Sequence, residues 1–297
     1  MGHSVSVVIA TNRGGPFLPA AVASVQGQTA PVAEITLVDD GVPDDSVRRF
    51  ADEQGLAYLR NPSSGVSSAR NAGARSTTSD WLAFLDDDDV WHPTRIEAQL
   101  DALATRPEAI ASYTGGWYMD IAGAEFGSGW RAPTTPNMRM LDGTVPLPRI
   151  TTLLVRRDAF SRVGGFNPTM KVGEDNDLIR KLLIRGDFVA VDVPLVGYRR
   201  HAGNVSNHLL EGRASALHSI RRLRSVAAAE GDTATTAALT EWWRRFRQAG
   251  SDENLGDLVA AVRRREWDYA ARVAWWGACV FPWQSVLAVA RRLRRQD

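Results

Sequence analysis

The sequence predicts an α/β fold with a mainly parallel sheet flanked by helices, followed by a helical extension at the C-terminal end. Short apolar, β-branched runs alternate with segments of helical composition from residue 5 to residue 106. Acidic residues directly follow two of these runs, where a parallel sheet binds its ligands. The last part of the chain is helical in composition and rich in Trp and Arg. We therefore expect one domain over residues 1–206 and an extension over 207–297.

The alternation can be followed element by element. Strands are expected at residues 5–10, 34–38, 56–59 and 80–85, and helices at 16–28, 44–54, 66–74 and 93–106. Pro93 suits the first turn of the last of these helices. Because each strand is separated from the next by a helix, the strands should be parallel, with their carboxyl ends at one edge of the sheet.

The second half of the first domain is less regular. Residues 125–149 are rich in Gly, Pro and Thr and show no sustained period, which is typical of a long functional loop. Order resumes with an apolar run at 150–155, a short helix near 157–163 and a helix over 174–186 that Gly186 ends. Two short strands are expected at 188–193 and 195–200, and only helices beyond them.

Composition excludes several classes of protein. A net charge of +1 over 297 residues argues against a nucleic-acid partner. Cys279 is the only cysteine, so neither a disulfide framework nor a thiolate zinc site is expected. The first residues lack the basic region and long apolar stretch of a signal peptide, and we expect a cytoplasmic protein.

Four consecutive aspartates, Asp86 to Asp89, follow the apolar run at 80–85. Adjacent carboxylates repel one another, and burying them is costly unless a positive charge compensates them. Alternate residues at a strand end can turn toward one point, so Asp86 and Asp88 suit a Mg²⁺ or Mn²⁺ ion that binds together with a diphosphate. The alternative is a solvated acidic turn. For Asp89 we expect a cap on the next helix.

Six motifs occur in an order that resembles a known family: VSVVIATN, LVDDG, GVSSARNAG, WLAFLDDDDVWHP, GGFN and GEDNDL. Together they resemble glycosyltransferase family two with the GT-A (Rossmann-like) fold, over residues 4 to 206. The resemblance implies a metal-dependent inverting enzyme that moves a sugar from a UDP- or dTDP-sugar to an acceptor hydroxyl. The acceptor would be a cell-envelope glycan, a lipid-linked sugar or a small molecule.

The resemblance also implies which residues bind the donor: Thr11, Asp40, Arg70, Asp86 and Asp87. A carboxylate at Asp40 can accept the imide N–H of uracil or thymine, and its alternative is a turn residue; Asp39 is expected to be structural. The guanidinium of Arg70 suits phosphate oxygens or a carboxylate. Its alternative is a surface arginine on an amphipathic helix.

Catalytic and metal-binding roles follow in the same way. The resemblance implies that Asp175 is the general base and that Glu174 supports it or contacts the acceptor. Capping of the helix is the alternative for both acids. It also implies that Asp88 is the direct metal ligand, with Mn²⁺ or Mg²⁺ as the cofactor. His201 could complete the metal shell, since neutral imidazole suits Mn²⁺, or it could be structural.

The tail allows two interpretations. The uncharged run from Val273 to Ala290 lies between arginines and contains two tryptophan neighbours, Trp275 and Trp276. Its length is borderline for a membrane span, and it suits peripheral contact with the inner face of the cell membrane better. The alternative is a helical cap on the catalytic domain or on a second subunit, which would give a homodimer.

Two other functions compete with the transferase. One is a catalytically silent GT-A domain that binds a nucleotide sugar or a partner protein; the presence of both the paired acids and Asp175 argues against it. The other is a sugar-1-phosphate nucleotidyltransferase, which the segment TNRGGPFLP does not fit because it lacks that class's glycine spacing and lysine. UDP and dTDP present the same imide edge, so both donors stay open.

Overall fold

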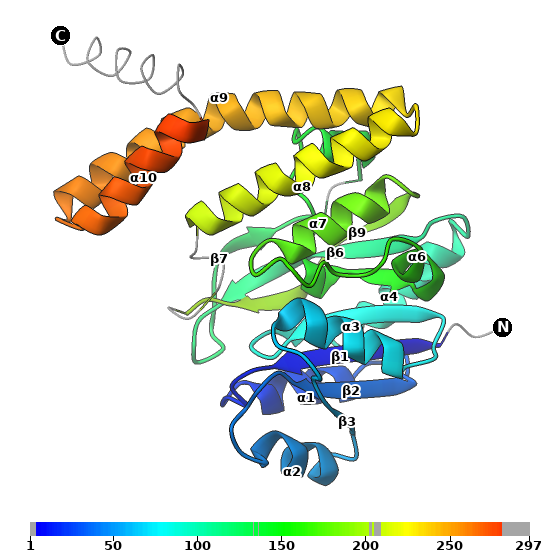
Figure 1. Cartoon of the computed structure of the whole chain (residues 1–297). Coiled ribbons are helices and arrows are strands. Elements are labelled where there is room, and N and C mark those ends of the chain that lie inside the picture. Colours follow the sequence, from blue (N-terminus) through cyan, green and yellow to red (C-terminus); the bar gives the residue numbers. More distant parts are fainter. Residues whose placement is uncertain (1–3, 133, 136, 202–203, 205–208, 281–297) are drawn as a thin grey trace. The chain divides into compact units, whose positions relative to one another are not determined.

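The computed structural model describes residues 4–132, 134–135, 137–201, 204 and 209–280. The chain divides into two compact units (Figure 1). The first comprises residues 1–137 and 147–207, and the second comprises Met138–Pro146 together with residues 208–297. The second unit thus takes in a short internal segment as well as the tail.

The first part of the sheet is parallel, as the alternation of strands and helices predicts. Its strands lie in the order β3-β2-β1-β4. They are β1 (Val5–Thr11), β2 (Glu34–Asp39), β3 (Ala57–Arg60) and β4 (Trp81–Asp86). All four therefore end at the same edge of the sheet.

Beyond β4 the sheet is mixed. The order continues β8-β6-β9-β5, with β7 paired to β6. Only the β6–β9 pair is parallel in this part. These strands are β5 (Val90–Trp91), β6 (Ala111–Met119), β7 (Glu125–Trp130), β8 (Leu154–Arg156) and β9 (Phe188–Arg199). The predicted fold class is confirmed, with a more mixed sheet than the alternation indicated.

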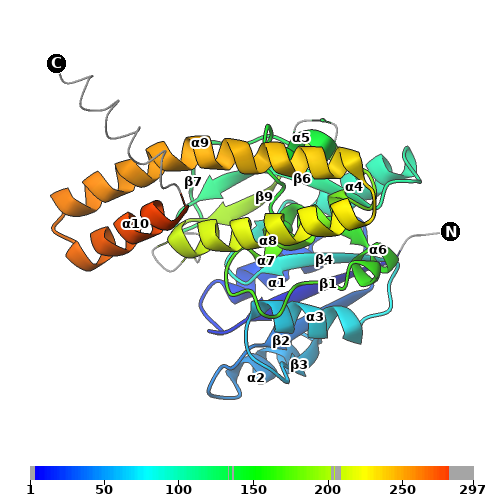
Figure 2. The ribbon, with the colours of Figure 1, turned by 45° about the horizontal axis from the view of Figure 1, so that its top comes forward.

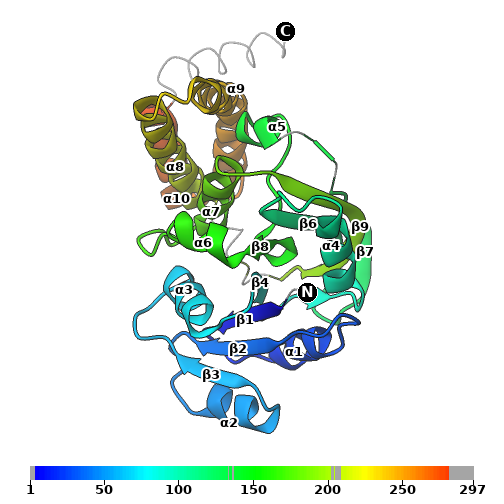
Figure 3. The same cartoon turned by 90° about the vertical axis from the view of Figure 1, so that its right-hand side faces the viewer.

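Helices cover both faces of this sheet, as Figure 3 shows. One face carries α1 (Leu18–Gln26), α2 (Ser46–Glu53) and α4 (Arg95–Ala104). The other carries α3 (Val66–Ser76), α6 (Arg157–Arg162) and α7 (Glu174–Leu183). Val7 and Ile9 of β1 belong to the core on the first face, and Val8 faces α3 on the second, as the two-residue period of a strand requires.

Two expectations for the second half were wrong in detail. The segment expected as a loop over 125–149 begins with β7 and also contains α5 (Asn137–Leu141). Gly127 and Gly129 interrupt the apolar alternation of β7, so the sequence pattern did not predict this strand. Both glycines have positive φ angles, 69° and 62°. The two short strands expected at 188–200 form the single strand β9. A turn of 3-10 helix, η1 (Ile150–Thr152), precedes β8.

The second unit is helical in its described part, as expected. Besides Met138–Pro146, it contains α8 (Leu209–Ala229), α9 (Thr233–Arg263) and α10 (Trp267–Val280), and Figure 2 shows α8 and α10 along successive parts of α9. Asp232 caps α9 by accepting the Thr235 N–H at 2.9 Å. No helix within the described residues is long and apolar enough to cross a bilayer. Residues 281–290 of the uncharged run lie outside the described residues.

Candidate active site

The carboxyl ends of β1, β2 and β4 bring the predicted binding residues together. In the strand register Thr11 stands opposite Asp39, and Ala10 stands opposite Asp86. Neighbouring strands are about 4.8 Å apart, so the ends of the three strands form one surface. The Asp40 N–H also donates to the Thr11 carbonyl at 2.8 Å. The two acidic motifs therefore belong to one site.

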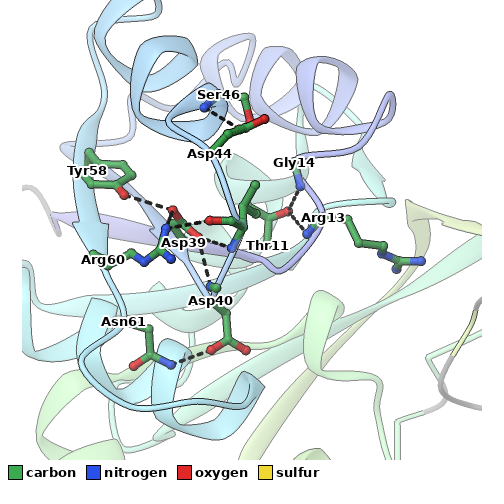
Figure 4. Close-up of polar contacts among 12 residues, drawn as sticks. Thr11, Arg13, Gly14, Asp39, Asp40, Asp44, Ser46, Tyr58, Arg60 and Asn61 are labelled. Atoms are coloured by element: carbon green, nitrogen blue, oxygen red, sulfur yellow. Dashed lines mark hydrogen bonds and ion pairs between the residues drawn. The ribbon is translucent and has the colours of Figure 1, made fainter.

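Asp39 is committed to holding the β2 turn (Figure 4). Its Oδ1 accepts the N–H groups of Gly41 and Val42 at 3.0 and 2.8 Å. Its Oδ2 accepts the Tyr58 hydroxyl at 3.0 Å and pairs with Arg60 at 2.5 Å. A buried carboxylate with four donors stabilises the turn and has no capacity left for a ligand, which agrees with the structural role expected for it.

Asp40 and Thr11 make separate polar contacts beside Asp39 (Figure 4). Asp40 uses one oxygen, Oδ1, to accept from Asn61 at 2.7 Å and from the Gly65 N–H at 2.9 Å. Its second oxygen takes no hydrogen bond from the described residues. The Thr11 hydroxyl donates to the Asp87 carboxylate and accepts the Gly14 N–H at 2.9 Å. Asp40 is thus a fixed carboxylate with one oxygen left to accept a donor.

Burial and neighbouring charge act together on Asp87. Burial raises the pKa of its carboxyl, the hydrogen bond from Thr11 lowers it in part, and the charges of Asp88 and Asp86 raise it again, to about 6. The cause is the crowding of adjacent carboxylates that the sequence displays. A cation nearby would relieve it.

Arg70 connects the aspartate cluster to α7. Its side chain is buried, and its two terminal nitrogens pair with Asp86 at 2.5 Å and with Glu174 at 2.9 Å. Burial alone would lower the pKa of Arg70, but the charges of Asp86 and Glu174 outweigh it and raise the pKa. Arg70 contacts carboxylates here, which is one of the two uses expected of it. Its contact with a nucleotide sugar stays a prediction.

Glu174 and Asp175 begin α7. The chain enters the helix through Gly173, whose φ of 76° favours glycine. Burial raises the pKa of Glu174, the Arg70 charge lowers it in part, and the Asp175 charge raises it. Asp175 is half-buried, and within the described part of the chain its carboxylate accepts one hydrogen bond, from the adjacent Asn176 N–H at 2.7 Å. Its carboxylate is therefore available at the start of the helix.

Asp88 lies against His201. The histidine Nε2 is 2.8 Å from Asp88 Oδ2, and both side chains are largely buried. Burial and the Asp86 charge raise the pKa of Asp88, and His201 opposes the rise. The sequence placed these residues far apart in the chain, and the structure brings the two predicted metal ligands into contact.

Asp89 does not cap the next helix, contrary to our expectation. The residue at the start of α4 is Thr94, because the chain first forms β5, whose pairing with β9 draws Asp89 into the interior. Asp89 Oδ1 accepts the Arg199 N–H at 3.0 Å, and its buried Oδ2 has no hydrogen-bond partner among the described residues. Burial, with the charges of Asp86 and Asp88, raises the pKa of Asp89 well above its usual value.

The residues present fit a hard divalent cation. One ligand oxygen from each of Asp86, Asp88 and Asp89 lies within 4.8 Å of the other two. Carboxylates and a neutral imidazole are the donors that Mn²⁺ accepts, and Mg²⁺ accepts the carboxylates. The unpaired oxygen of Asp89 is a buried group that a cation would satisfy.

Two arginines of the site were missed from the sequence. The Arg199 side chain donates from Nε to the Asp88 carbonyl at 2.9 Å and from a terminal nitrogen to the Asp120 carbonyl at 2.9 Å. It thereby fixes the backbone of the aspartate run. The positive charge of Arg149 acts on Asp89. Arg199 stands two residues before His201, which was the available signal; Arg149 ends a segment expected to be a loop and carried none.

The fold and the acidic cluster define the class of protein. A sheet of this order with carboxylates at the ends of β2 and β4 is the GT-A arrangement. The model of glycosyl transferase family 2 matches residues 6–164, and the chain belongs to that family. The resemblance inferred from the motifs is confirmed.

Relatives and solved structures agree with this assignment. The chain is 27% identical to an uncharacterized glycosyltransferase of Haemophilus influenzae, over 62% of this chain and 63% of that protein. It is 23% identical to chondroitin synthase of Escherichia coli, over 68% of this chain and 30% of that protein. It therefore matches less than two thirds of the length of these relatives.

Two further comparisons name a nucleotide sugar. A glucosyltransferase of Escherichia coli, WfaP, whose name gives UDP-Glc as its donor, is 31% identical over 34% of this chain and 41% of that protein. The structure of S. aureus TarS 1–349 in complex with UDP-GlcNAc superposes with a TM-score of 0.57 at 14% identity, covering 91% of this chain and 90% of that one. At that identity the likeness shows a shared fold.

Proposed function

We propose that this protein is a metal-dependent inverting glycosyltransferase that moves a sugar from a UDP- or dTDP-sugar to an acceptor hydroxyl. One observation carries the proposal: the oxygen cluster of Asp86, Asp88 and Asp89 is joined through Arg70 to the acidic start of α7. The candidate metal ligands are thus joined to Glu174, the chain neighbour of the candidate base Asp175. A structural acidic turn would not need that connection.

The donor would bind at the ends of β1 and β2. The second oxygen of Asp40, which accepts no hydrogen bond from the described residues, can take the imide N–H of uracil or thymine. Thr11, which donates to Asp87, and Asp86 at the end of β4 would bind the ribose and diphosphate. The UDP-sugars in the names of WfaP and of the TarS complex favour UDP.

The reaction needs a base for the acceptor hydroxyl, departure of the diphosphate and neutralisation of the negative charge that the diphosphate gains. Asp175 accepts the proton of the acceptor hydroxyl as its oxygen attacks the anomeric carbon from the face opposite the nucleotide. The bond to the diphosphate breaks as the new bond forms, and the configuration inverts. Arg70 fixes Glu174 beside Asp175 on the acceptor side. Mn²⁺ or Mg²⁺ held by Asp88 and His201 would neutralise charge on the departing diphosphate.

A test that needs no acceptor separates this enzyme from a catalytically silent domain. We expect the protein with Mn²⁺ to release UDP from UDP-glucose or UDP-GlcNAc by slow hydrolysis. Asp175→Asn should reduce the rate about 100-fold, the lower range for loss of a general base, while UDP binding persists. Asp52→Asn, at an exposed acid on α2, is the matched control. UDP binding without any release by the unaltered protein would indicate the silent domain.

We also propose that the second unit contacts a membrane interface, which would favour a lipid-linked acceptor. Trp267 and Trp275 of α10 have 63% and 75% of their surface exposed, and Arg272 is exposed between them. Exposed tryptophan with arginine suits the lipid headgroup region. Sedimentation with vesicles containing phosphatidylglycerol should recover the protein, and Trp267→Ala/Trp275→Ala should abolish recovery. A dimer without vesicle binding would instead assign these residues to a second copy of the chain.

A further inference from the structure

Arg149 lies against three aromatic rings on the β6, β7 and β9 part of the sheet. Its guanidinium carbon is 4.5 Å from the Tyr198 ring centre, 4.6 Å from the Trp130 ring and 5.6 Å from the Tyr118 ring. One terminal nitrogen also donates to the Tyr118 hydroxyl at 3.1 Å. We call Arg149, Tyr118, Trp130 and Tyr198 the Arg149 platform. All four residues belong to the first unit.

The backbone is shaped to accept these rings. A Cβ on Gly116 would lie 2.3 Å from the Trp130 ring, so only glycine lets Trp130 lie directly on β6. Tyr118 and Tyr198 are paired in the register of β6 and β9, and the Tyr118 and Trp130 ring centres are 5.3 Å apart. All three rings are half-buried, and Phe126, stacked on Tyr118, is 44% exposed. The platform therefore keeps part of its aromatic surface open.

Arg149 is positioned by a rigid segment. It precedes η1, and Thr152 donates its N–H and its hydroxyl to the Arg149 carbonyl at 3.0 and 2.7 Å. Buried side chains of β5 and α4 donate to three carbonyls of the next residues: Trp91 to Thr151 at 3.1 Å, Gln99 to Thr152 at 3.1 Å and Arg95 to Leu153 at 3.1 Å. The cation is held in place before any ligand arrives.

Within the described residues Arg149 contacts aromatic rings and a hydroxyl. Among the described residues no carboxylate pairs with it, although its charge acts on Asp89 of the acidic cluster. The exposed Arg200 adds a second guanidinium, 5.7 Å from the Tyr118 ring. Aromatic faces attract the C–H groups of sugar rings, and an arginine without a carboxylate attracts an anionic group. The two features therefore suit a single ligand that has both a sugar ring and an anionic group.

We propose that the Arg149 platform is an acceptor subsite that binds a sugar bearing a negative group, either a carboxylate or a phosphate. The sugar ring would stack on the open aromatic surface, and the negative group would pair with Arg149. This proposal rests on the proposed function, because it names the class of acceptor that the transferase would use. A neutral acceptor would leave the guanidinium without an anion.

The test measures binding of three small probes to the full chain by ligand-observed NMR, with and without UDP and Mg²⁺: glucuronate, glucose 6-phosphate and methyl glucoside. We expect one charged probe to bind about tenfold or more tightly than methyl glucoside, as expected for a charge-assisted pair. A preference for glucuronate alone indicates a carboxylate, and one for glucose 6-phosphate alone indicates a phosphate. If neither charged probe exceeds methyl glucoside, the proposal is wrong.

Variants assign the preference to Arg149. Arg149→Gln should abolish the advantage of the charged probe, and Arg149→Lys, which keeps the charge, should retain part of it. Arg131→Gln should retain all of it, because Arg131 is 71% exposed and already paired with Asp192. An advantage that persists in Arg149→Gln overturns the subsite. Absence of UDP binding in the unaltered protein would contradict the proposed function instead. The measurements without UDP would still test whether the Arg149 platform binds the charged probes.

Discussion

At the scale of single residues, the negative charge of each of the four aspartates is compensated by a different group. Each carboxylate has its own partner: Arg70 for Asp86, Thr11 for Asp87, His201 for Asp88 and the Arg199 N–H for Asp89. The compensation is incomplete, because the pKa of Asp87, Asp88 and Asp89 stays raised by burial and mutual repulsion. A group of carboxylates whose mutual repulsion is only partly compensated is suited to bind a cation.

The contact between His201 and Asp88 makes the histidine a testable ligand. We expect His201→Gln to weaken Mn²⁺ binding about tenfold or more, because the imidazole either ligates the ion or orients Asp88. Titration followed by electron paramagnetic resonance of free Mn²⁺ gives the affinity. His92→Gln, at an exposed histidine, is the control and should leave it unchanged. Equal affinities in all three proteins would return His201 to a structural role.

Arg70 is expected to support stability as well as the site. Arg70→Met removes a buried cation that pairs with the buried Glu174 and the half-buried Asp86, and it should lower the free energy of unfolding by about 3–5 kcal/mol at pH 7, the range for breaking a buried ion pair. Urea unfolding measures the loss. Arg75→Met, on the exposed side of the same helix, should cost little. A loss for Arg70→Met no larger than for Arg75→Met would mean that the carboxylates do not depend on the guanidinium.

At the scale of elements, α3 must approach the sheet closely to deliver Arg70. Gly73 allows the approach, since a Cβ there would lie 2.5 Å from Val8 and 2.9 Å from Val38. Arg70 stands one helical turn earlier, so the distance between α3 and β1 sets how far the guanidinium reaches toward Asp86.

Gly73→Ala should therefore destabilise the protein by about 1–3 kcal/mol through overpacking, despite the better helix propensity of alanine. Chemical unfolding gives the change. Adding Val8→Ala makes room for the new methyl group, so the two changes together should cost less than the sum of their separate costs. Gly15→Ala, where the nearest atom beyond chain neighbours is 4.0 Å away, is the control. Additive costs would show that α3 is not held at its limit of approach.

The same elements show how far the sequence could be interpreted. Regular alternation predicted β1 to β4 and their helices because hydrophobic period and turn residues agree there, and strand ends then placed Asp40 and Asp86 at one edge. The segment of β7 was missed because its glycines break the period. The role of Asp89 depended on β5 pairing with β9, a contact between residues more than one hundred positions apart. The local sequence pattern does not show which distant strands will pair.

At the scale of the whole molecule, the second unit includes a segment that lies, in sequence, between the two parts of the first unit. Met138–Pro146 belongs to it, and a Cβ on Gly143 would lie 2.6 Å from the Trp242 ring of α9. Trp242 also stacks on Phe246, with ring centres 4.9 Å apart. Within the second unit, α9 thus packs against the Met138–Pro146 segment.

Trp242→Ala should lower the free energy of unfolding by about 2 kcal/mol, less than the 3–5 kcal/mol of a fully buried tryptophan because the ring is half-buried. Trp275→Ala, at a side chain that is 75% exposed, should change it little. Thermal and urea unfolding of the two variants measure the difference. Equal effects would mean that the Met138–Pro146 segment does not depend on this ring.

The central claim is that the aspartates bind a metal ion together with a nucleoside diphosphate. Calorimetric titration with UDP, dTDP and GDP, each with and without Mn²⁺, tests it most directly. We expect UDP or dTDP to bind only with Mn²⁺, GDP to bind weakly, and Asp88→Ala to abolish the metal-dependent binding. Binding that is the same without Mn²⁺, or that survives Asp88→Ala, would contradict the account.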